Sequence, residues 1–264
     1  MSIQDRQIAT AERLNIPLKK IPRNLAIIMD GNGRWAQARS LSRAEGHIEG
    51  AKTAEKIALT CARLGIESLT LYSFSIENWK RPADEVKALM SLYKEYLISM
   101  RPMLARENVR LIHLGRTAHR PVSGCAELKK TIAETAQNDG MVFGFALNYG
   151  GRSEIVDATR AIAQKCLCGE LAIQDIDPEC ISRHLYTDTI ADPDLVIRTA
   201  NELRISNFLL WQISYSEFYV AKTYWPDFSD EDLDLAIQAY ARRDRRYGDL
   251  TATKPSTGVR SAAP

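Results

Sequence analysis

The chain has 264 residues, with 35 lysines and arginines against 33 aspartates and glutamates and a net charge of +2. This length suits one α/β domain with a large core. The small net charge gives no general attraction to nucleic acid or to an anionic membrane, so any phosphate binding must be local. No apolar run approaches the ~18 residues of a spanning helix. The five cysteines lack paired C-x-x-C spacing, which favours reduced thiols in the cytoplasm.

Residues 1–22 are polar with scattered apolar positions and predict a surface helix that ends before Pro17 and Pro22. Residues 25–29 are apolar throughout, as is typical of a strand buried on both faces of a parallel sheet. They lead into a turn with two glycines over residues 30–34 and then into a predicted helix, whose free N–H groups favour an anion. An anion beside the Asp30 carboxylate requires a divalent cation such as Mg²⁺ between them. Alternatively, Asp30 only caps the helix, which leaves the nearby arginines unexplained.

The rest of the chain alternates predicted helices and strands. Apolar residues at helical spacing predict helices over 47–64, 85–107, 123–137, 153–165, 178–185 and after residue 229, and apolar runs predict strands over 68–74, 109–115, 141–148, 195–199 and 217–221. This pattern predicts one α/β domain over residues 23–250, a mainly parallel six-stranded sheet flanked by helices, and a flexible tail over 251–264. Ligands of such sheets bind at the carboxyl ends of the strands, so the turns at Asp30, Ser75, Tyr149 and Arg198 should converge on one crevice.

The predicted crevice is rich in arginine, whose fork of donors matches the oxygens of a diphosphate. The chain has neither the G-x-x-x-x-G-K-[S/T] motif of P-loop enzymes nor a strand-linked G-x-G-x-x-G, which disfavours nucleotide sites of those kinds. Long helices with broad apolar faces could wall a hydrophobic tunnel. Phosphate at one end and hydrocarbon at the other describe an isoprenoid diphosphate.

Ordered motifs extend over residues 24–248. They are Leu25-Ala26-Ile27-Ile28-Met29-Asp30-Gly31-Asn32-Gly33-Arg34-Trp35-Ala36, Gly46-His47, Phe74-Ser75 with Glu77-Asn78-Trp79 and Arg81-Pro82, Asn148-Tyr149-Gly150-Gly151-Arg152, Arg198-Thr199, Glu202, Arg204-Ile205-Ser206-Asn207, Glu217 and Trp225-Pro226-Asp227-Phe228. Together they resemble the motifs of the cis-prenyltransferases, typified by undecaprenyl diphosphate synthase. The D-D-x-x-D motif of the trans-prenyltransferases is not matched, because Asp230-Glu231-Asp232-Leu233-Asp234 differs from it and reads as the start of a helix.

The resemblance implies a homodimeric, Mg²⁺-dependent transferase. Such an enzyme adds isopentenyl diphosphate in cis to an allylic diphosphate, such as farnesyl or geranyl diphosphate, and makes a polyprenyl diphosphate of the undecaprenyl carrier-lipid type. We expect these substrates and a second copy of the chain as partners, contact with a membrane surface for product release, and no nucleic acid. Product length is not readable from the sequence. A non-catalytic subunit of the same fold is the alternative, but it should lack the metal carboxylate and the phosphate-binding arginines.

The resemblance also implies a role for each matching residue. Asp30 and Asn78 are the expected catalytic residues, and Asp30 and Glu217 are the expected metal ligands. The expected substrate-binding residues are Gly31, Asn32, Gly33, Arg34, Trp35, Arg43, His47, Ser75, Trp79, Arg81, Arg198, Arg204 and Ser206. The proton acceptor stays open between Asp30, Asn78 with Ser75, and the diphosphate itself.

Two of these residues have plainer alternatives, and one turn departs from the family pattern. His47 could merely cap or pack a helix, and Trp79 could be a core aromatic. Ala200-Asn201 stands where the family usually has Ser-Gly or Gly-Gly, so a Cβ occupies a tight turn beside Arg204.

Overall fold

A computed structural model describes residues 1–116 and 125–243 of the chain. Six strands form one sheet in the order β3-β4-β2-β1-β5-β6, and every neighbouring pair is parallel. The strands are β1 (Asn24–Ile28), β2 (Ser68–Ser75), β3 (Arg110–Leu114), β4 (Val142–Tyr149), β5 (Leu195–Arg198) and β6 (Glu217–Val220). The α/β class, the six strands and their parallel direction are therefore confirmed.

The α-helices of the described residues alternate with these strands. They are α1 (Ile3–Leu14), α2 (Asn32–Gln37), α3 (Arg43–Leu64), α4 (Ala83–Arg106), α5 (Cys125–Thr135), α6 (Gly151–Leu167), α7 (Pro178–Ser182) and α8 (Asp230–Ala241). Most predicted boundaries lie within two residues of the observed ones, but two were further off. Helix α3 begins four residues early, because Ser42 and Glu45 form a capping box. Helix α7 ends at Ser182 instead of 185. The start of the predicted helix over 123–137 and the predicted tail over 251–264 lie outside the described residues.

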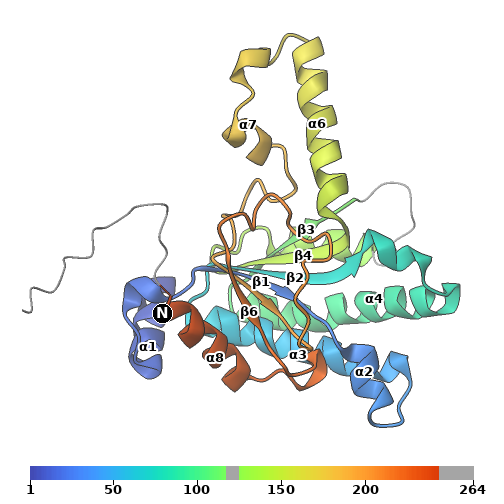
Figure 1. Cartoon of the computed structure of the whole chain (residues 1–264), viewed down its shortest axis with the longest axis vertical. Helices are drawn as coiled ribbons and strands as arrows, with labels where there is room; N and C mark the ends of the chain where they lie inside the picture. Colours follow the sequence, from blue (N-terminus) through green and yellow to red (C-terminus); the bar gives the residue numbers. More distant parts are fainter. Residues whose placement is uncertain (117–124, 244–264) are drawn as a thin grey trace, which may run out of the picture.

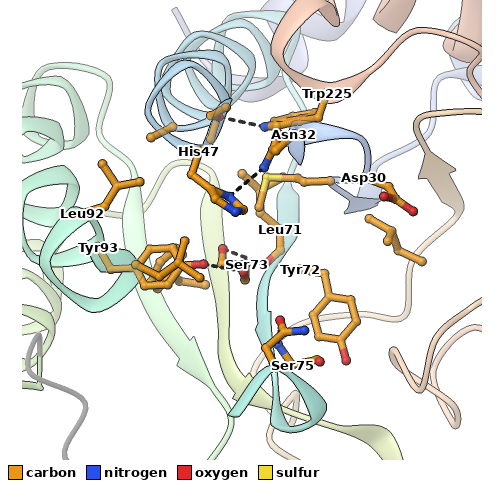
Figure 2. Close-up of a pocket in the computed structure, with 18 of the residues that line it drawn as sticks. Asp30, Asn32, His47, Leu71, Tyr72, Ser73, Ser75, Leu92, Tyr93 and Trp225 are labelled. Atoms are coloured by element: carbon orange, nitrogen blue, oxygen red, sulfur yellow. Dashed lines mark hydrogen bonds between the residues drawn. The ribbon is translucent and has the colours of Figure 1, made fainter. Parts of the chain in front are cut away.

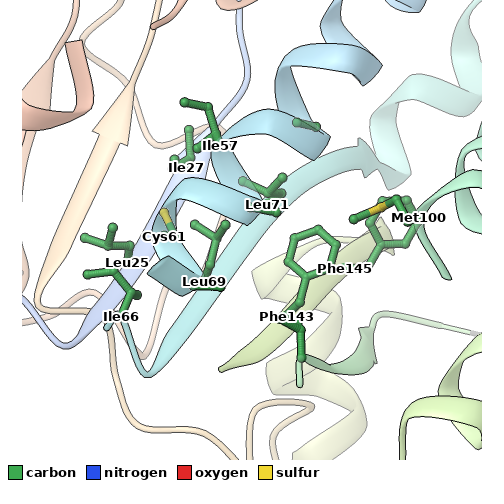
Figure 3. Packing of buried hydrophobic residues seen from close by; sticks show 14 of the residues in the cluster. Leu25, Ile27, Ile57, Cys61, Ile66, Leu69, Leu71, Met100, Phe143 and Phe145 are labelled. Carbon is green, nitrogen blue, oxygen red and sulfur yellow. The ribbon is translucent and has the colours of Figure 1, made fainter. Parts of the chain in front are cut away.

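One face of the sheet packs against helices. Figure 1 shows α1, α3, α4 and α8 along the same side of the sheet, and Figure 3 shows side chains of β1 and β2 meeting those of α3. Leu25, Ile27, Leu69 and Leu71 are at most 1% exposed there, and Ile57 of α3 is fully buried. Strand residues at every second position share a face, so the apolar runs of β1 and β2 supply this core with alternate side chains.

The other face is covered differently. Its core residues on the sheet, which include Ala26, Tyr72 and Val196, pack against Phe208 and Leu209 from the segment between β5 and β6. That segment is rich in turns and carries no α-helix. Helix α6 starts at the sheet but projects away from it, with α7 beside it (Figure 1). The flanking helices thus lie mainly on one face, while a turn-rich segment closes the other face next to the carboxyl end of β5.

None of the helices in the described ranges is long and apolar enough to cross a bilayer. The four cysteines whose side chains are described, Cys61, Cys166, Cys168 and Cys180, are free thiols.

Candidate active site

The turn after β1 holds Asp30 by its backbone. The Asp30 N–H donates to Oγ1 of Thr199 at 2.8 Å, and that hydroxyl donates to the Asp30 carbonyl oxygen at 2.7 Å. Gly31 follows with φ +104°, a conformation that L side chains rarely adopt. A Cβ at Gly31 would lie 2.6 Å from Cδ1 of Tyr224. The glycine is therefore required both by the backbone and by packing, and it starts α2 directly beside the carboxylate.

Three arginines surround the Asp30 carboxylate. Arg198 donates to Oδ2 at 2.7 Å, Arg34 donates to Oδ1 at 3.2 Å, and Nη2 of Arg204 lies 3.6 Å from Oδ2. Burial opposes ionisation of Asp30, but the hydrogen bonds and charges of Arg198 and Arg34 outweigh it and lower the pKa of the carboxyl below its usual value. Asp30 is therefore ionised at neutral pH and is a poor base.

Turns at several strand ends meet at one cavity of about 310 Å³. Its polar lining, partly visible in Figure 2, comes from Asp30, Asn32, His47, Ser73, Ser75, Asn78, Arg81, Arg198, Arg204 and Ser206. The turns after β1, β2 and β5 thus converge as predicted. The turn after β4 does not line the cavity, because Tyr149 is fully buried behind it.

The cavity also has an apolar side. Leu89, Leu92, Tyr93 and Tyr96 of α4 line it together with Ala51 and Ala54 of α3, Leu71 of β2 and Phe145 of β4. Figure 2 shows Leu92 and Tyr93 on the wall away from Asp30. One cavity therefore offers cations and hydrogen-bond donors at one end and hydrocarbon surface at the other. An isoprenoid diphosphate has the matching parts, a charged diphosphate and an apolar chain. The structure shows a cavity here, and the predicted tunnel stays a prediction.

His47 and Asn32 form a pair on the cavity wall (Figure 2). The Asn32 amide nitrogen lies 3.3 Å from Nδ1 of His47, and Nε2 of His47 is buried without a hydrogen-bond partner among the described residues. Burial and the nearby Arg81 lower the pKa of His47 to about 4, against a weaker opposing effect of Glu85. A neutral ring whose Nδ1 accepts from Asn32 carries its proton on Nε2, which suits donation to a phosphate oxygen.

The loop after β2 brings further polar groups. Ser75 N–H donates to Oδ1 of Asn78 at 3.0 Å, which fixes the Asn78 amide, and Arg81 donates to Glu85 at 3.1 Å. Trp79 turns away from the cavity lining, because its ring packs edge to face on Phe74 at 5.1 Å. Its Nε1 donates to Oδ1 of Asn148 at 2.7 Å. This placement matches the core-aromatic alternative for Trp79.

Five other predicted substrate-binding residues do not line the cavity. They are Gly31 and Arg34, which lie beside Asp30, and Gly33, Trp35 and Arg43. The Trp35 ring is buried and its Nε1 donates to Asp227 at 2.7 Å. A Cβ at Gly33 would lie 3.4 Å from Nε of Arg43. Arg43 itself faces a groove of about 560 Å³ between the start of α3 and the first half of α4, which adjoins the cavity at His47, Leu89 and Leu92.

Glu217 is not brought to Asp30 within one chain. It begins β6 and pairs in register with Leu195, whereas Asp30 follows the opposite end of β1. Glu217 forms an ion pair with Arg243 and lines a different groove, together with Lys19, Lys20 and Arg23.

Two residues near Asp30 were missed as site residues. Glu202 accepts from Arg34 at 2.9 Å and also pairs with Arg204, so it links two of the arginines. Thr199 holds the Asp30 backbone as described above. Both lie inside the quoted motifs, so their position next to the arginines was the available signal.

Comparison with known proteins agrees with this geometry. The family model described as "Putative undecaprenyl diphosphate synthase" matches residues 28–248. The chain belongs to the undecaprenyl diphosphate synthase family. It is 47% identical to an isoprenyl transferase of Bacillus subtilis, over 88% of this chain and 89% of that protein. It is also 48% identical to a farnesyl-diphosphate-specific ditrans,polycis-undecaprenyl-diphosphate synthase of Lactiplantibacillus plantarum, over 89% and 92% of the two chains.

Solved structures support the same assignment. The lavandulyl diphosphate synthase of Lavandula x intermedia, crystallised with dimethylallyl diphosphate, aligns with a TM-score of 0.85 and 35% identity, over 88% of this chain and all of that one. A probable undecaprenyl diphosphate synthase of Campylobacter jejuni aligns with a TM-score of 0.71 and 30% identity, over 86% and 99%. The chain is therefore a cis-prenyltransferase with the family's sheet.

The cavity suits a Mg²⁺ ion of the kind expected for this family. Asp30 is the one acidic residue among the described residues that line the cavity, and no cluster of three or more acidic, histidine or cysteine side chains forms a metal cage in the described ranges. Mg²⁺ is commonly held by one or two carboxylates together with substrate phosphates and water. A single carboxylate beside a cluster of arginines fits that mode.

Proposed function

We propose that the chain is a Mg²⁺-dependent synthase that condenses isopentenyl diphosphate with an allylic diphosphate, such as farnesyl or geranyl diphosphate, to give a polyprenyl diphosphate of the undecaprenyl carrier-lipid type. The observation that carries the proposal is the cavity with Asp30 and its arginines at one end and the apolar side chains of α3 and α4 at the other. The free thiols fit the cytoplasm as its location, and release of a long product fits contact with a membrane surface.

Two diphosphate sites can be assigned on opposite sides of Asp30. Arg198 donates to Oγ of Ser206 at 2.8 Å, and these two residues with Arg204 would hold isopentenyl diphosphate. On the other side, Arg34, the N–H groups that begin α2, and Nε2 of His47 would hold the allylic diphosphate, with Arg43 and Arg81 near its outer edge. Arginine forks stabilise departing diphosphate oxygens, and Arg198, with a side chain 5% exposed, is the most deeply buried of them here.

The condensation requires a group that stabilises the leaving diphosphate and a group that accepts a proton. Asp30 would hold Mg²⁺, and the ion would supply positive charge to the diphosphate that leaves the allylic carbon. Asp30 is a weaker base than the diphosphate, because the arginines lower the pKa of its carboxyl. The departing diphosphate is the better place for the proton lost from the isopentenyl unit, and Asn78 with Ser75 would act as positioning groups.

Glu217 lies at the amino ends of the strands, whereas Asp30 of the same chain lies at their carboxyl ends. Glu217 can therefore serve as a second metal ligand only if a second copy of the chain supplies it. The proposed enzyme is therefore a homodimer whose sites are completed across the interface.

The proposal is tested by incubating the protein with Mg²⁺, labelled isopentenyl diphosphate and farnesyl or geranyl diphosphate, and then determining product length and double-bond geometry. We expect long cis products. Asp30→Asn should lower turnover at least ~10²-fold while the far-ultraviolet circular dichroism is unchanged. No incorporation by folded protein with either primer would contradict the proposal.

A further inference from the structure

The two glycines that begin α6 mark a junction between three segments. Gly151 N–H donates to the carbonyl oxygen of Asn207 at 2.7 Å, and Arg152 N–H donates to Oδ1 of the same residue at 2.9 Å. Asn207 has φ +63°, a left-handed conformation that asparagine tolerates. The turn from Arg204 to Asn207 is thus attached to the start of α6 by both the backbone and the side chain of one asparagine.

The loop after β2 reaches the same junction. Because Oδ1 of Asn207 accepts from Arg152, its Nδ2 faces the loop and donates to Oε1 of Glu77 at 2.8 Å. The junction leaves no space for another atom, since a Cβ at Gly150 would lie 2.8 Å from both Nδ2 of Asn207 and Cδ1 of Ile76.

Both segments that the Asn207–Glu77 hydrogen bond joins also line the cavity. Ser206, next to Asn207, accepts from Arg198 at 2.8 Å, and its carbonyl oxygen accepts from the Tyr72 hydroxyl at 3.2 Å. Beside Glu77, Asn78 lines the cavity on the same loop. The side-chain contact of Asn207 with Glu77 therefore joins the segment assigned to one diphosphate to the loop that brings Ser75, Asn78 and Arg81 to the cavity.

We propose that Asn207 is a positioning residue that latches the Ser75–Arg81 loop to the Arg204–Ser206 turn, so that a diphosphate bound at one site favours binding at the other. This inference rests on the proposed function, because it uses the same two substrates. The Asn207–Glu77 hydrogen bond holds the two segments in one arrangement, so a substrate that contacts one segment also stabilises the other. Such coupling is reciprocal, so each substrate raises the affinity of the other by the same factor.

Substitutions can exchange the donor and the acceptor of the Asn207–Glu77 hydrogen bond while keeping the shapes of both side chains. In Asn207→Asp, one carboxylate oxygen still accepts from Arg152, but the other faces the Glu77 carboxylate and repels it. In Glu77→Gln, the side-chain carbonyl oxygen still accepts from Asn207, so little change is expected. In the double variant Asn207→Asp/Glu77→Gln, the Gln amide can donate to the new carboxylate and restore the latch. Asn207→Asp/Asp84→Asn is the matched control, because Asp84 lies on exposed surface at the start of α4 and its change restores the net charge without restoring the contact.

The readout is the dissociation constant of isopentenyl diphosphate, measured by calorimetry in Mg²⁺ buffer with and without a non-ionising thio analogue of farnesyl diphosphate. We expect the analogue to tighten binding by about 3- to 10-fold in the wild-type chain, as suits one charge-assisted hydrogen bond at a partly exposed position. The factor should fall to about 1 in Asn207→Asp and in the Asp84 control, and should return in the double variant with Glu77→Gln. Thermal unfolding of each variant shows whether its fold is intact.

An unchanged factor in folded Asn207→Asp would overturn the latch, and so would equal recovery in the Asp84 control. If the wild-type chain binds neither ligand, the proposed function itself fails. If it binds both and the factor is 1, only the latch fails.

Discussion

Arg198 is the most deeply buried of the three arginines at Asp30, with a side chain 5% exposed against 57% for Arg204. Its two terminal nitrogens serve Asp30 and Ser206 at the same time. In Arg198→Lys the single ammonium cannot reach both groups, and KM for isopentenyl diphosphate should rise by about 10- to 100-fold. Steady-state kinetics with each substrate varied in turn measure this. Arg204→Lys is the control, with an expected change below about tenfold; equal effects of the two variants would contradict the assigned roles.

His47 makes stability depend on pH with a defined sign. Its folded pKa of about 4 lies below the ordinary 6.5, so between these values the unfolded chain binds the proton and the folded chain does not. Stability is therefore fully present above pH 6.5 and is lost as the pH falls toward 4. When the pH falls from 7.5 to 5, protonation of this histidine in the unfolded chain should lower the free energy of unfolding by about 2 kcal/mol.

His47→Gln removes that contribution, and urea unfolding of both proteins at the two pH values measures the difference. The same loss with pH in the variant would show that other groups cause it.

At the scale of secondary-structure elements, α2 and α3 pack closely together at Gly46. A Cβ at Gly46 would lie 2.3 Å from the Asn32 carbonyl oxygen. Gly46→Ala should push α3 away from the first turn of α2, lower the free energy of unfolding by about 2 kcal/mol and raise KM for the allylic diphosphate. Chemical denaturation and kinetics test this together. Glu49→Ala, one turn along the exposed side of α3, should change stability by less than about 0.5 kcal/mol.

The sheet face that packs against helices could be predicted because short stretches of the sequence determine its strands and turns. Apolar runs gave the strands, and the glycines after Met29 gave the turn at Asp30. The other face could not be predicted, since its covering segment depends on non-glycine residues in left-handed conformation: Ala200, Asn201, Ser206, Asn207 and Leu209. Hydrogen bonds to distant segments impose such conformations, and no periodicity in the sequence records them.

Glu217 shows the limit of carrying a role over from a family. The predicted strand over 217–221 already places its first residue at the amino edge of a parallel sheet, away from Asp30, and the structure confirms that position. The motif match identifies the residue type but not which copy of the chain it would serve.

At the scale of the whole molecule, a site shared across subunits can be tested by mixing two inactive proteins. Asp30→Asn and Glu217→Gln subunits, each defective alone, should form heterodimers in which one site has both native carboxylates. If Glu217 acts across the interface, the mixed sample recovers about one quarter of wild-type turnover after subunit exchange, because half of the dimers have one intact site. Analytical ultracentrifugation verifies the dimers. No recovery in exchanged dimers would remove Glu217 from the metal site.

The turn-rich covering of the second face also bears on how the molecule opens and closes. Residues 199–216 have no helical or strand ladder of their own and are held by scattered hydrogen bonds to other segments, among them those from Tyr72, Gly151 and Arg152. We expect their amides to exchange with solvent through local openings, whereas those of β1 and β2 exchange only on global unfolding. Hydrogen exchange followed by mass spectrometry measures this, and equal protection of the two regions would refute it. The substrates would then contribute to folding itself, since they would stabilise a segment that has no helical or strand ladder of its own.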